Sequence, residues 1–261
     1  MDTPAVKDLL DFRGAVVVVT GASAGIGAGI ATRFAEAGAD VVVHYRGNQA
    51  GARAVAAEIQ KLGRRAVTIK ADVSESSGGA DLINAAVQAF GSVDVLINNA
   101  GSYPASPLVD MAEAEWDRVI ADNLRSVHVC TQAAARAMIE RRKSGAIVNI
   151  ASIEAENSAP MHTHYTAAKA AVVMYTRTAA LELGGKGIRV NCVSPGLIWR
   201  EGLDRDWPEG VNAYKEAVPL GRLGTDADVA DACLFLASRA ARWITGANLL
   251  VDGGILTNRA Y

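Results

Sequence analysis

Short, continuous apolar runs rich in valine and isoleucine recur along this chain of 261 residues. They cover residues 15–19, 41–44, 66–71, 93–97, 146–150, 189–193 and 248–251. Because the runs are continuous rather than alternating, they indicate strands that are buried on both faces, as in a parallel sheet. The pattern therefore predicts seven strands of one buried sheet.

Longer segments with helical spacing of apolar residues separate these runs. They cover residues 26–37, 50–62, 80–90, 113–141, 165–183 and 226–238. Strand and helix that alternate from end to end imply βαβ crossovers. We therefore expect one α/β domain over residues 1–261, with its core at about 14–254: a doubly wound, Rossmann-like parallel sheet of seven strands with helices on both faces. The aperiodic stretch 197–219 is expected to be a substrate-binding loop or lid.

Composition excludes several classes of function. Charged residues make up 21% of the chain and the formal net charge is −2, so there is no basic field to bind nucleic acid or acidic lipid. The cysteines are dispersed and the histidines do not cluster, which argues against a disulfide framework or a metal site. Residues 1–13 resemble no signal peptide, and the apolar runs are far shorter than a membrane span. We expect a cytoplasmic protein.

A glycine-rich turn follows the first predicted strand and opens into the first predicted helix. It reads Thr20-Gly21-Ala22-Ser23-Ala24-Gly25-Ile26-Gly27. Glycines allow a tight turn whose backbone N–H groups approach a pyrophosphate at the positive end of the helix. The alternative is a turn selected for packing alone, but the strand before it and the helix after it favour dinucleotide binding. The turn lacks the Gly-Lys-Ser/Thr ending of nucleoside triphosphatases.

Further motifs follow the turn in a fixed order. They are Asp72-Val73, Asn98-Asn99-Ala100-Gly101, Asn123, Ser152, the pair Tyr165-x-x-x-Lys169, Pro195-Gly196 and Val251-Asp252-Gly253-Gly254. Each motif alone is common, but the ordered series resembles the short-chain dehydrogenase/reductase family, and in particular its 3-oxoacyl carrier-protein reductases. The resemblance implies a catalytic tetrad of Asn123, Ser152, Tyr165 and Lys169. It also implies cofactor contacts at Gly21, Ser23, Ala24, Gly25, Ile26, Gly27, Asp72, Val73, Asn99, Ala100, Gly101, Tyr165, Lys169, Pro195, Gly196 and Ile198.

Tyr165 and Lys169 lie four residues apart, so both project from one face of the predicted helix. A nearby ammonium favours the phenolate, and we therefore expect Lys169 to lower the pKa of Tyr165. Tyr165 would then act as the acid/base toward the substrate oxygen, to which Ser152 donates a hydrogen bond. By resemblance, Lys169 also holds the nicotinamide ribose, and Asn123 anchors a water molecule that relays protons.

The end of the second predicted strand bears on the choice of nicotinamide. It reads His44-Tyr45-Arg46-Gly47-Asn48, without the acid that would accept hydrogen bonds from the ribose hydroxyls of NAD. Arg46 can pair with the 2′-phosphate of NADP, assisted by Tyr45, Ser23 and Asn48, so NADP(H) is favoured over NAD(H). The alternatives are a solvated Arg46 in an NAD-dependent alcohol or polyol dehydrogenase, and a dinucleotide-binding protein without catalytic activity.

Candidate substrate contacts flank the expected cleft: Tyr103, Glu154, His162, Trp199, Arg200 and Trp207. Arg200 stands where many relatives carry a threonine, and it addresses either an anionic substrate or a facing acid. Trp199, Trp207 and Tyr214 either close over a ligand or only pack the lid down. The resemblance implies a small ketone or secondary alcohol as substrate. It also implies a homotetramer: the helices predicted at 113–141 and 165–183 resemble those through which family members dimerise, and the C-terminal stretch resembles the one that completes their tetramers.

Overall fold

A parallel sheet of seven strands forms the centre of the computed structural model, which describes residues 3–142 and 144–257. The strand order is β3-β2-β1-β4-β5-β6-β7. The strands are β1 (Val16–Val19), β2 (Asp40–Tyr45), β3 (Ala66–Lys70), β4 (Val95–Asn98), β5 (Gly145–Ile150), β6 (Ile188–Pro195) and β7 (Asn248–Val251). The predicted doubly wound α/β sheet is confirmed.

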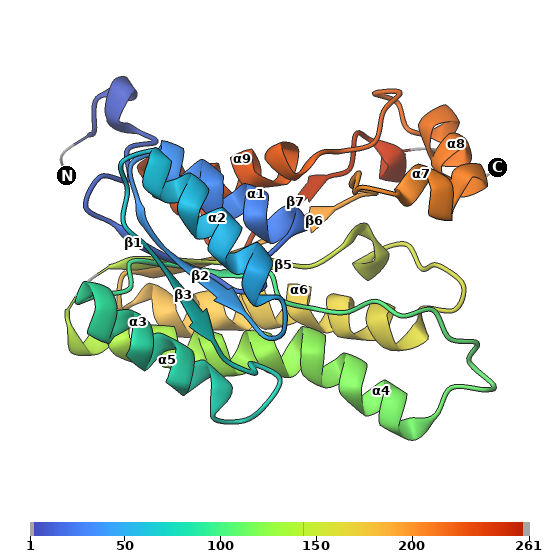
Figure 1. The fold of residues 1–261 in the computed structure, drawn as a ribbon, viewed down its shortest axis with the longest axis horizontal. Coiled ribbons are helices and arrows are strands. Elements are labelled where there is room, and N and C mark those ends of the chain that lie inside the picture. The colour runs from blue at the N-terminus through green and yellow to red at the C-terminus, as the bar shows by residue number, and fades with distance from the viewer. Residues whose placement is uncertain (1–2, 143, 258–261) are drawn as a thin grey trace.

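Helices cover both faces of the sheet (Figure 1). One face carries α1 (Gly25–Glu36), α2 (Gln49–Lys61) and α9 (Asp226–Ala237), and the other carries α3 (Gly78–Phe90), α5 (Ser126–Glu140) and α6 (Thr163–Gly184). Val17 and Val19 belong to the apolar core under α1 and α9, whereas Val18 belongs to the core under α3 and α5. Successive strand residues point to opposite faces, so burial of both faces explains the continuous apolar runs.

The helix predicted over 113–141 is helical from 113 to 140 but not regular. It consists of α4 (Glu113–Ile120), a π-helical turn (Ala121–Arg125) and α5. Within the π-helical turn, Asp122 and Asn123 are both buried. Such turns often occur at functional sites.

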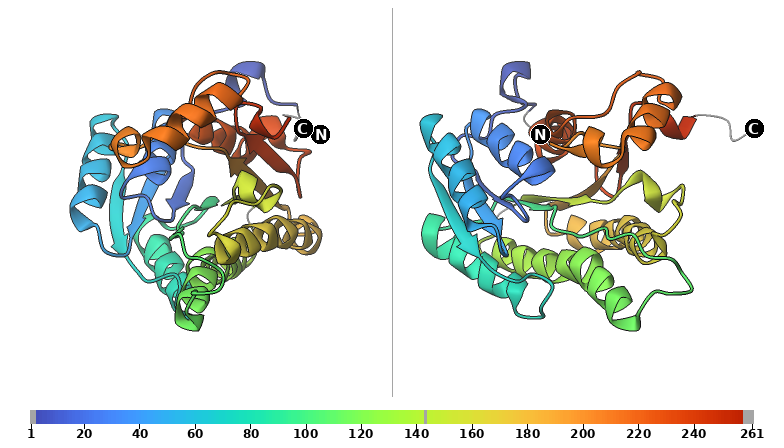
Figure 2. Two further views of the ribbon diagram at one scale, coloured as in Figure 1. Left: turned by 90° about the vertical axis from the view of Figure 1, so that its right-hand side faces the viewer. Right: turned by 45° about the vertical axis from the view of Figure 1, so that its right-hand side comes forward.

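The stretch 197–219 contains two helices, so the expectation of an irregular loop is wrong in this respect. They are α7 (Leu203–Asp206) and α8 (Pro208–Ala217), the latter with its proline in the first helical turn. Leu203, Val211 and Leu223 form a small buried cluster of their own. Both views of Figure 2 show these orange helices on the side of the sheet that carries α1.

The described residues contain neither a candidate membrane span nor a candidate metal site. Across 3–142 and 144–257, no helix is long and apolar enough to cross a membrane. In the same part of the chain, no group of three or more His, Cys, Asp or Glu side chains is placed to hold a metal ion.

Candidate active site

The predicted site residues gather at one edge of the sheet, where the carboxyl ends of the strands lie. The glycine turn follows β1, Arg46 follows β2, Asp72 follows β3, Asn99 follows β4, Ser152 follows β5 and Gly196 follows β6. Ligands of open α/β sheets bind at this edge. A cavity of about 190 Å³ lies there, lined by Gly21, Ser23, His44, Tyr45, Arg46, Gly47, Asp72, Val73, Ser74, Ala100, Gly101 and Asp122.

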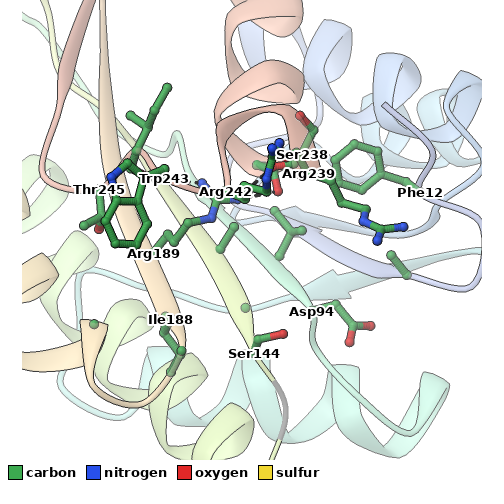
Figure 3. A pocket seen from close by; sticks show the side chains of 18 of the residues that line it. Phe12, Asp94, Ser144, Ile188, Arg189, Ser238, Arg239, Arg242, Trp243 and Thr245 are labelled. Carbon is green, nitrogen blue, oxygen red and sulfur yellow. Dashed lines mark hydrogen bonds between the residues drawn. The ribbon is translucent and has the colours of Figure 1, made fainter. Parts of the chain in front are cut away.

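A larger cavity, of about 610 Å³, lies at the opposite edge of the sheet. Phe12, Asp94, Ser144, Ile188 and Trp243 line it near the amino ends of the strands (Figure 3). On its wall the guanidinium of Arg189 donates hydrogen bonds to the carbonyl oxygens of Leu236, Ala237 and Ser238 at the end of α9. This cavity contains none of the predicted site residues among those that the structure describes, so the smaller cavity is the candidate site.

The glycine turn is held in place from neighbouring strands. Asn99 donates from Nδ2 to the carbonyl oxygens of Thr20 (2.9 Å) and Gly21 (3.2 Å). The hydroxyl oxygen of Thr20 accepts hydrogen bonds from the backbone N–H groups of Asn99 and Ala100, both at 2.9 Å. From β2, Nδ1 of His44 accepts the N–H of Gly21 at 3.0 Å. These contacts fix the backbone of the turn before any ligand binds.

The turn is packed on one side and open on the other. A Cβ at Gly27 would collide with the carbonyl oxygen of Gly21 and the amide of Asn99. A Cβ at Gly25, whose φ is +55°, would meet nothing within 4 Å. The first residue before α1 is Ala24, whose side chain gives no capping hydrogen bond, so the amides of the first turn remain available to an anion. The turn therefore fits the pyrophosphate of a dinucleotide.

Ser152, Tyr165 and Lys169 come together beyond the end of β5. Ser152 caps a short 3₁₀ helix, with its Oγ accepting the N–H of Glu154 at 3.1 Å. Nζ of Lys169 donates to the carbonyl oxygen of Ile150 at 2.8 Å and lies 5.5 Å from the centroid of the Tyr165 ring. The structure thus groups the two residues on α6 with the serine that follows β5.

Asn123 lies against Gly101 and is fully buried. Its Nδ2 donates to the carbonyl oxygens of Ser102 (2.7 Å) and Val119 (3.0 Å), while its Oδ1 is buried and accepts from no residue in the described part of the chain. A Cβ at Gly101 would touch this Oδ1 and lie 3.7 Å from Nζ of Lys169. Asn123 and Lys169 therefore face the same small space.

Burial governs the charges of this group. It raises the pKa of Tyr165, whereas the hydrogen bond to Ser152 lowers it and the nearby Glu154 raises it. Burial also lowers the pKa of Lys169 to about 8. The pKa of Tyr165 thus lies above its ordinary value rather than below it, because the loss of hydration outweighs the other interactions; the group that favours the phenolate is Ser152.

Arg46 is paired with a carboxylate, although its side chain is more than half exposed. Its Nη1 donates to Oδ1 of Asp122 at 2.8 Å and lies 3.8 Å from Oδ1 of Asp72. Ser23 and Tyr45 line the same cavity, whereas Oδ1 of Asn48 accepts the N–H of Gly51 and caps α2. The end of β2 thus presents a cation whose side chain is already paired with a carboxylate.

Polar and aromatic side chains flank Tyr165 on the substrate side. Nδ1 of His162 lies 3.0 Å from Oε2 of Glu154, which also accepts the hydroxyl of Thr166 at 3.3 Å. The rings of His162 and Tyr103 have their centroids 5.8 Å and 6.1 Å from that of Tyr165. These candidate contacts therefore converge on the phenol.

The segment after β6 is anchored by its aromatic and glycine residues. The hydroxyl of Tyr214 donates to the carbonyl oxygen of Asp252 and accepts the N–H of Leu197, and a Cβ at Gly196, next to Pro195, would collide with it. Tyr214 therefore packs the lid down. Ile198 forms a bridge with Gly224.

The remaining lid residues are exposed or paired. Trp199 and Trp207 are more than half exposed. Nη1 of Arg200 donates to Oδ2 of Asp206 at 2.8 Å, so the facing acid predicted for this arginine is Asp206.

The sequence analysis missed several residues that shape the site. His44 joins the glycine turn to β3, since its Nε2 also lies 3.1 Å from the carbonyl oxygen of Ala71. Ser102 and Asp122 form a hydrogen bond of 2.8 Å at the cavity wall. A polar residue inside an apolar strand was the available signal for His44, whereas Asp122 carries no signal because its partners are distant in sequence.

Comparison with known proteins gives close matches over most of the chain. The family model described as "Enoyl-(Acyl carrier protein) reductase" matches residues 21–256. L-rhamnose 1-dehydrogenase (NAD(P)(+)) of Azotobacter vinelandii is 43% identical over 93% of this chain and 96% of its own length. The 3-oxoacyl-(acyl-carrier-protein) reductase of Staphylococcus epidermidis is 42% identical over 91% and 97%. The structure of 7 alpha-hydroxysteroid dehydrogenase with NADH and 7-oxo glycochenodeoxycholic acid matches with a TM-score of 0.91 and 38% identity over 96% of this chain and 98% of that one.

Fold and relatives together define the class: an NAD(P)-dependent oxidoreductase that acts on CH–OH or C=O groups. The chain belongs to the short-chain dehydrogenase/reductase family, as its motifs predict.

Proposed function

We propose that this enzyme transfers a hydride between NADP(H) and the carbon of a ketone or secondary alcohol, with Tyr165 as its acid/base. The observation that carries the proposal is the grouping of Ser152, Tyr165 and Lys169 beside an open glycine turn. Hydride chemistry is supplied by the bound nicotinamide dinucleotide. The protein residues position the substrate oxygen and move its proton.

Tyr165 would serve first as a proton donor. Burial holds its pKa above the ordinary value, so the phenol is protonated at neutral pH and can donate its proton to a substrate oxygen that becomes negative during reduction. Ser152 would donate a second hydrogen bond to the same oxygen and stabilise the developing charge. In the oxidative direction the same two groups act in reverse.

Lys169 and Asn123 would return the proton to Tyr165. The pKa of Lys169, about 8, lies close to neutral pH, where a group can both give and take a proton. The free, buried Oδ1 of Asn123 is available to a water molecule that passes protons to Lys169. This support from the residues agrees with the relay that the family resemblance implies.

The cofactor preference follows from the end of β2. Arg46 is the cation of the small cavity, and a planar guanidinium pairs well with the 2′-phosphate of NADP. The rhamnose dehydrogenase above carries both cofactors in its name. We therefore propose NADP(H) as the better-bound cofactor, with NAD(H) as a usable alternative.

A second candidate narrows the substrate to polyhydroxylated compounds, such as sugars in their cyclic form. It is favoured by the pair of Glu154 and His162 beside Tyr165, because a carboxylate and an imidazole together accept and donate hydrogen bonds to neighbouring hydroxyl groups. An acyl chain would instead need an apolar wall. The relative that acts on L-rhamnose supports this candidate.

Steady-state assays test the function. Wild-type enzyme should oxidise sugars or alcohols with NADP⁺, or reduce ketones and 3-oxoacyl thioesters with NADPH, and Tyr165→Phe should lower kcat by about 1,000-fold or more because the proton donor is lost. Nicotinamide fluorescence should report nearly unchanged NADPH binding by that variant. If Tyr165→Phe retained wild-type turnover, the proposed acid/base would be wrong.

The substrate class is tested with Glu154→Gln. If hydroxyl groups are recognised here, the variant should raise KM for sugars by about tenfold, the loss of one charge-assisted hydrogen bond, without changing KM for a simple ketone. Exposed Glu113, on α4, supplies the matched control Glu113→Gln. Equal effects of Glu154→Gln on both substrates would reject the polyol candidate.

We also propose a homotetramer. Exposed apolar side chains on the helices named by the family resemblance support it: Ile139 on α5, and Met174 and Leu181 on α6.

A further inference from the structure

The cavity at the end of β2 contains a buried carboxylate that comes from a distant part of the chain. Asp122 lies in the π-helical turn between α4 and α5, and its side chain is 6% exposed. Its Oδ1 accepts a hydrogen bond of 2.8 Å from Nη1 of Arg46, whose side chain is 56% exposed. The acid that is missing at the end of β2 is therefore supplied from another element.

Asp122 is fixed from the side away from Arg46. Its Oδ2 accepts the hydroxyl of Ser102 at 2.8 Å. Its carbonyl oxygen accepts the hydroxyl of Ser126 at 2.6 Å, and the adjacent Asn123 donates to the carbonyl oxygen of Ser102. To turn away from Arg46, this carboxylate would have to give up its hydrogen bond with Ser102 as well, so it offers Arg46 a well-held partner.

The ion pair with Asp122 limits the hydrogen-bond donors that Arg46 can offer to a ligand. A guanidinium has five N–H donors in a rigid fork, and one terminal nitrogen is engaged by Asp122. A 2′-phosphate must bind to the remaining donors, or else pull Arg46 from Asp122 and leave a buried carboxylate short of a partner. NAD(H), which lacks this phosphate, requires neither change.

We propose that Asp122 is a specificity-determining residue that restrains Arg46 and so reduces the advantage of NADP(H) over NAD(H). This inference rests on the proposed function, in which Arg46 meets the 2′-phosphate. Asp122 acts through Arg46 and touches no reacting group. Its removal should shift the preference of the enzyme further toward NADP(H).

Equilibrium binding of NADPH and NADH, followed by nicotinamide fluorescence, tests the inference. Asp122→Asn keeps the shape of the side chain and an oxygen for Ser102, but removes the charge. We expect it to tighten NADPH binding by about threefold to fivefold, the upper part of the range for one partly exposed ion pair, and to change NADH binding by less than about twofold. Asp117→Asn, at an exposed position on α4, is the matched control and should change neither constant.

A double-mutant cycle shows whether Asp122 acts through Arg46. In the Arg46→Ala background, Asp122→Asn should no longer tighten NADPH binding. If Asp122→Asn tightened NADPH binding equally with and without Arg46, Asp122 would act by repelling the phosphate directly, and the proposed restraint of Arg46 would be wrong. Thermal unfolding monitors folding, and Asp122→Ser provides a second variant with a hydroxyl for Ser102.

The outcomes separate the two proposals. If wild-type protein binds NADPH but Asp122→Asn leaves the ratio of the two dissociation constants unchanged, the inference fails and the proposed function stands. If wild-type protein binds neither dinucleotide, the proposed function fails and the inference fails with it.

Discussion

Burial, more than charge, sets the proton affinity of individual residues around the site. The same loss of hydration raises the pKa of Tyr165, lowers that of Lys169 to about 8 and lowers that of His44. His44 is the most informative of the three, because its neutral ring has two assigned partners. Nδ1 accepts the N–H of Gly21, and Nε2–H is left to donate to the carbonyl oxygen of Ala71.

Protonation of His44 should therefore destabilise the fold. Its pKa in the folded protein lies below the ordinary 6.5, so the unfolded chain takes up the proton first as the pH falls. The free energy of unfolding should decrease as the pH drops below about 6.5, by roughly 1.4 kcal/mol for each unit of the shift in pKa.

Urea unfolding at pH 7 and pH 5 measures this effect. The decrease should be smaller in His44→Gln, which cannot be charged. His128→Gln alters an exposed position on α5. Its free energy of unfolding should decrease between pH 7 and pH 5 as much as that of the wild type. An equal decrease in His44→Gln and wild type would contradict the role of His44.

At the scale of elements, the glycine turn contains a glycine whose backbone conformation and free space can be matched by a glycine elsewhere in the chain. Gly25 and Gly63 both have positive φ, +55° and +74°, and a Cβ at either would meet nothing within 4 Å. They differ in position, because Gly25 opens α1 beside the candidate site whereas Gly63 follows α2.

This pair gives a matched prediction. Gly25→Ala and Gly63→Ala should each lower the free energy of unfolding by about 1 kcal/mol, the cost of a left-handed conformation for an L residue. Only Gly25→Ala should weaken NADPH binding, by about tenfold or more, since the added methyl enters the space for the pyrophosphate. Chemical denaturation and fluorescence titration provide the two measurements. If both variants bound NADPH equally well, the pyrophosphate would not lie at the glycine turn.

The helices and strands also show how much of the fold could be predicted from the sequence. The strands were predictable because burial on both faces leaves continuous apolar runs, such as the fully buried β1. α7 is only four residues long, too short to show helical periodicity, and the π-helical turn lies within a longer helical pattern that hides it. The Arg46–Asp122 pair joins residues 76 positions apart, which no local pattern reveals.

The whole molecule uses the two edges of its sheet differently. The carboxyl edge carries the candidate site, whereas at the amino edge Arg189 ties the end of α9 to the start of β6. Between the edges, α6 presents Leu181 with 84% of its surface exposed. With Met174 on the same helix and Ile139 on α5, it supports the proposed interface between subunits.

Assembly can be tested at this position. Leu181→Glu should weaken the proposed tetramer by about 30-fold or more in its dissociation constant, because a charge without a partner would be buried at the interface. Sedimentation velocity over a range of concentrations measures the change. Leu62→Glu, which alters an exposed leucine at the end of α2, is the control. A monomeric wild type, or a Leu181→Glu protein that assembles like wild type, would contradict the proposal.

The number of residues in the π-helical turn sets how the side chains before and after it are oriented. One extra residue in a helical turn rotates everything beyond it by about 100° relative to a regular α-helix. Deleting a single residue from Ala121–Arg125 would restore regular spacing, and Asp122 and Asn123 could then not both face inward while α5 kept its buried face. A homologous chain could thus keep every recognisable motif and the same fold, yet lose this arrangement through one missing codon.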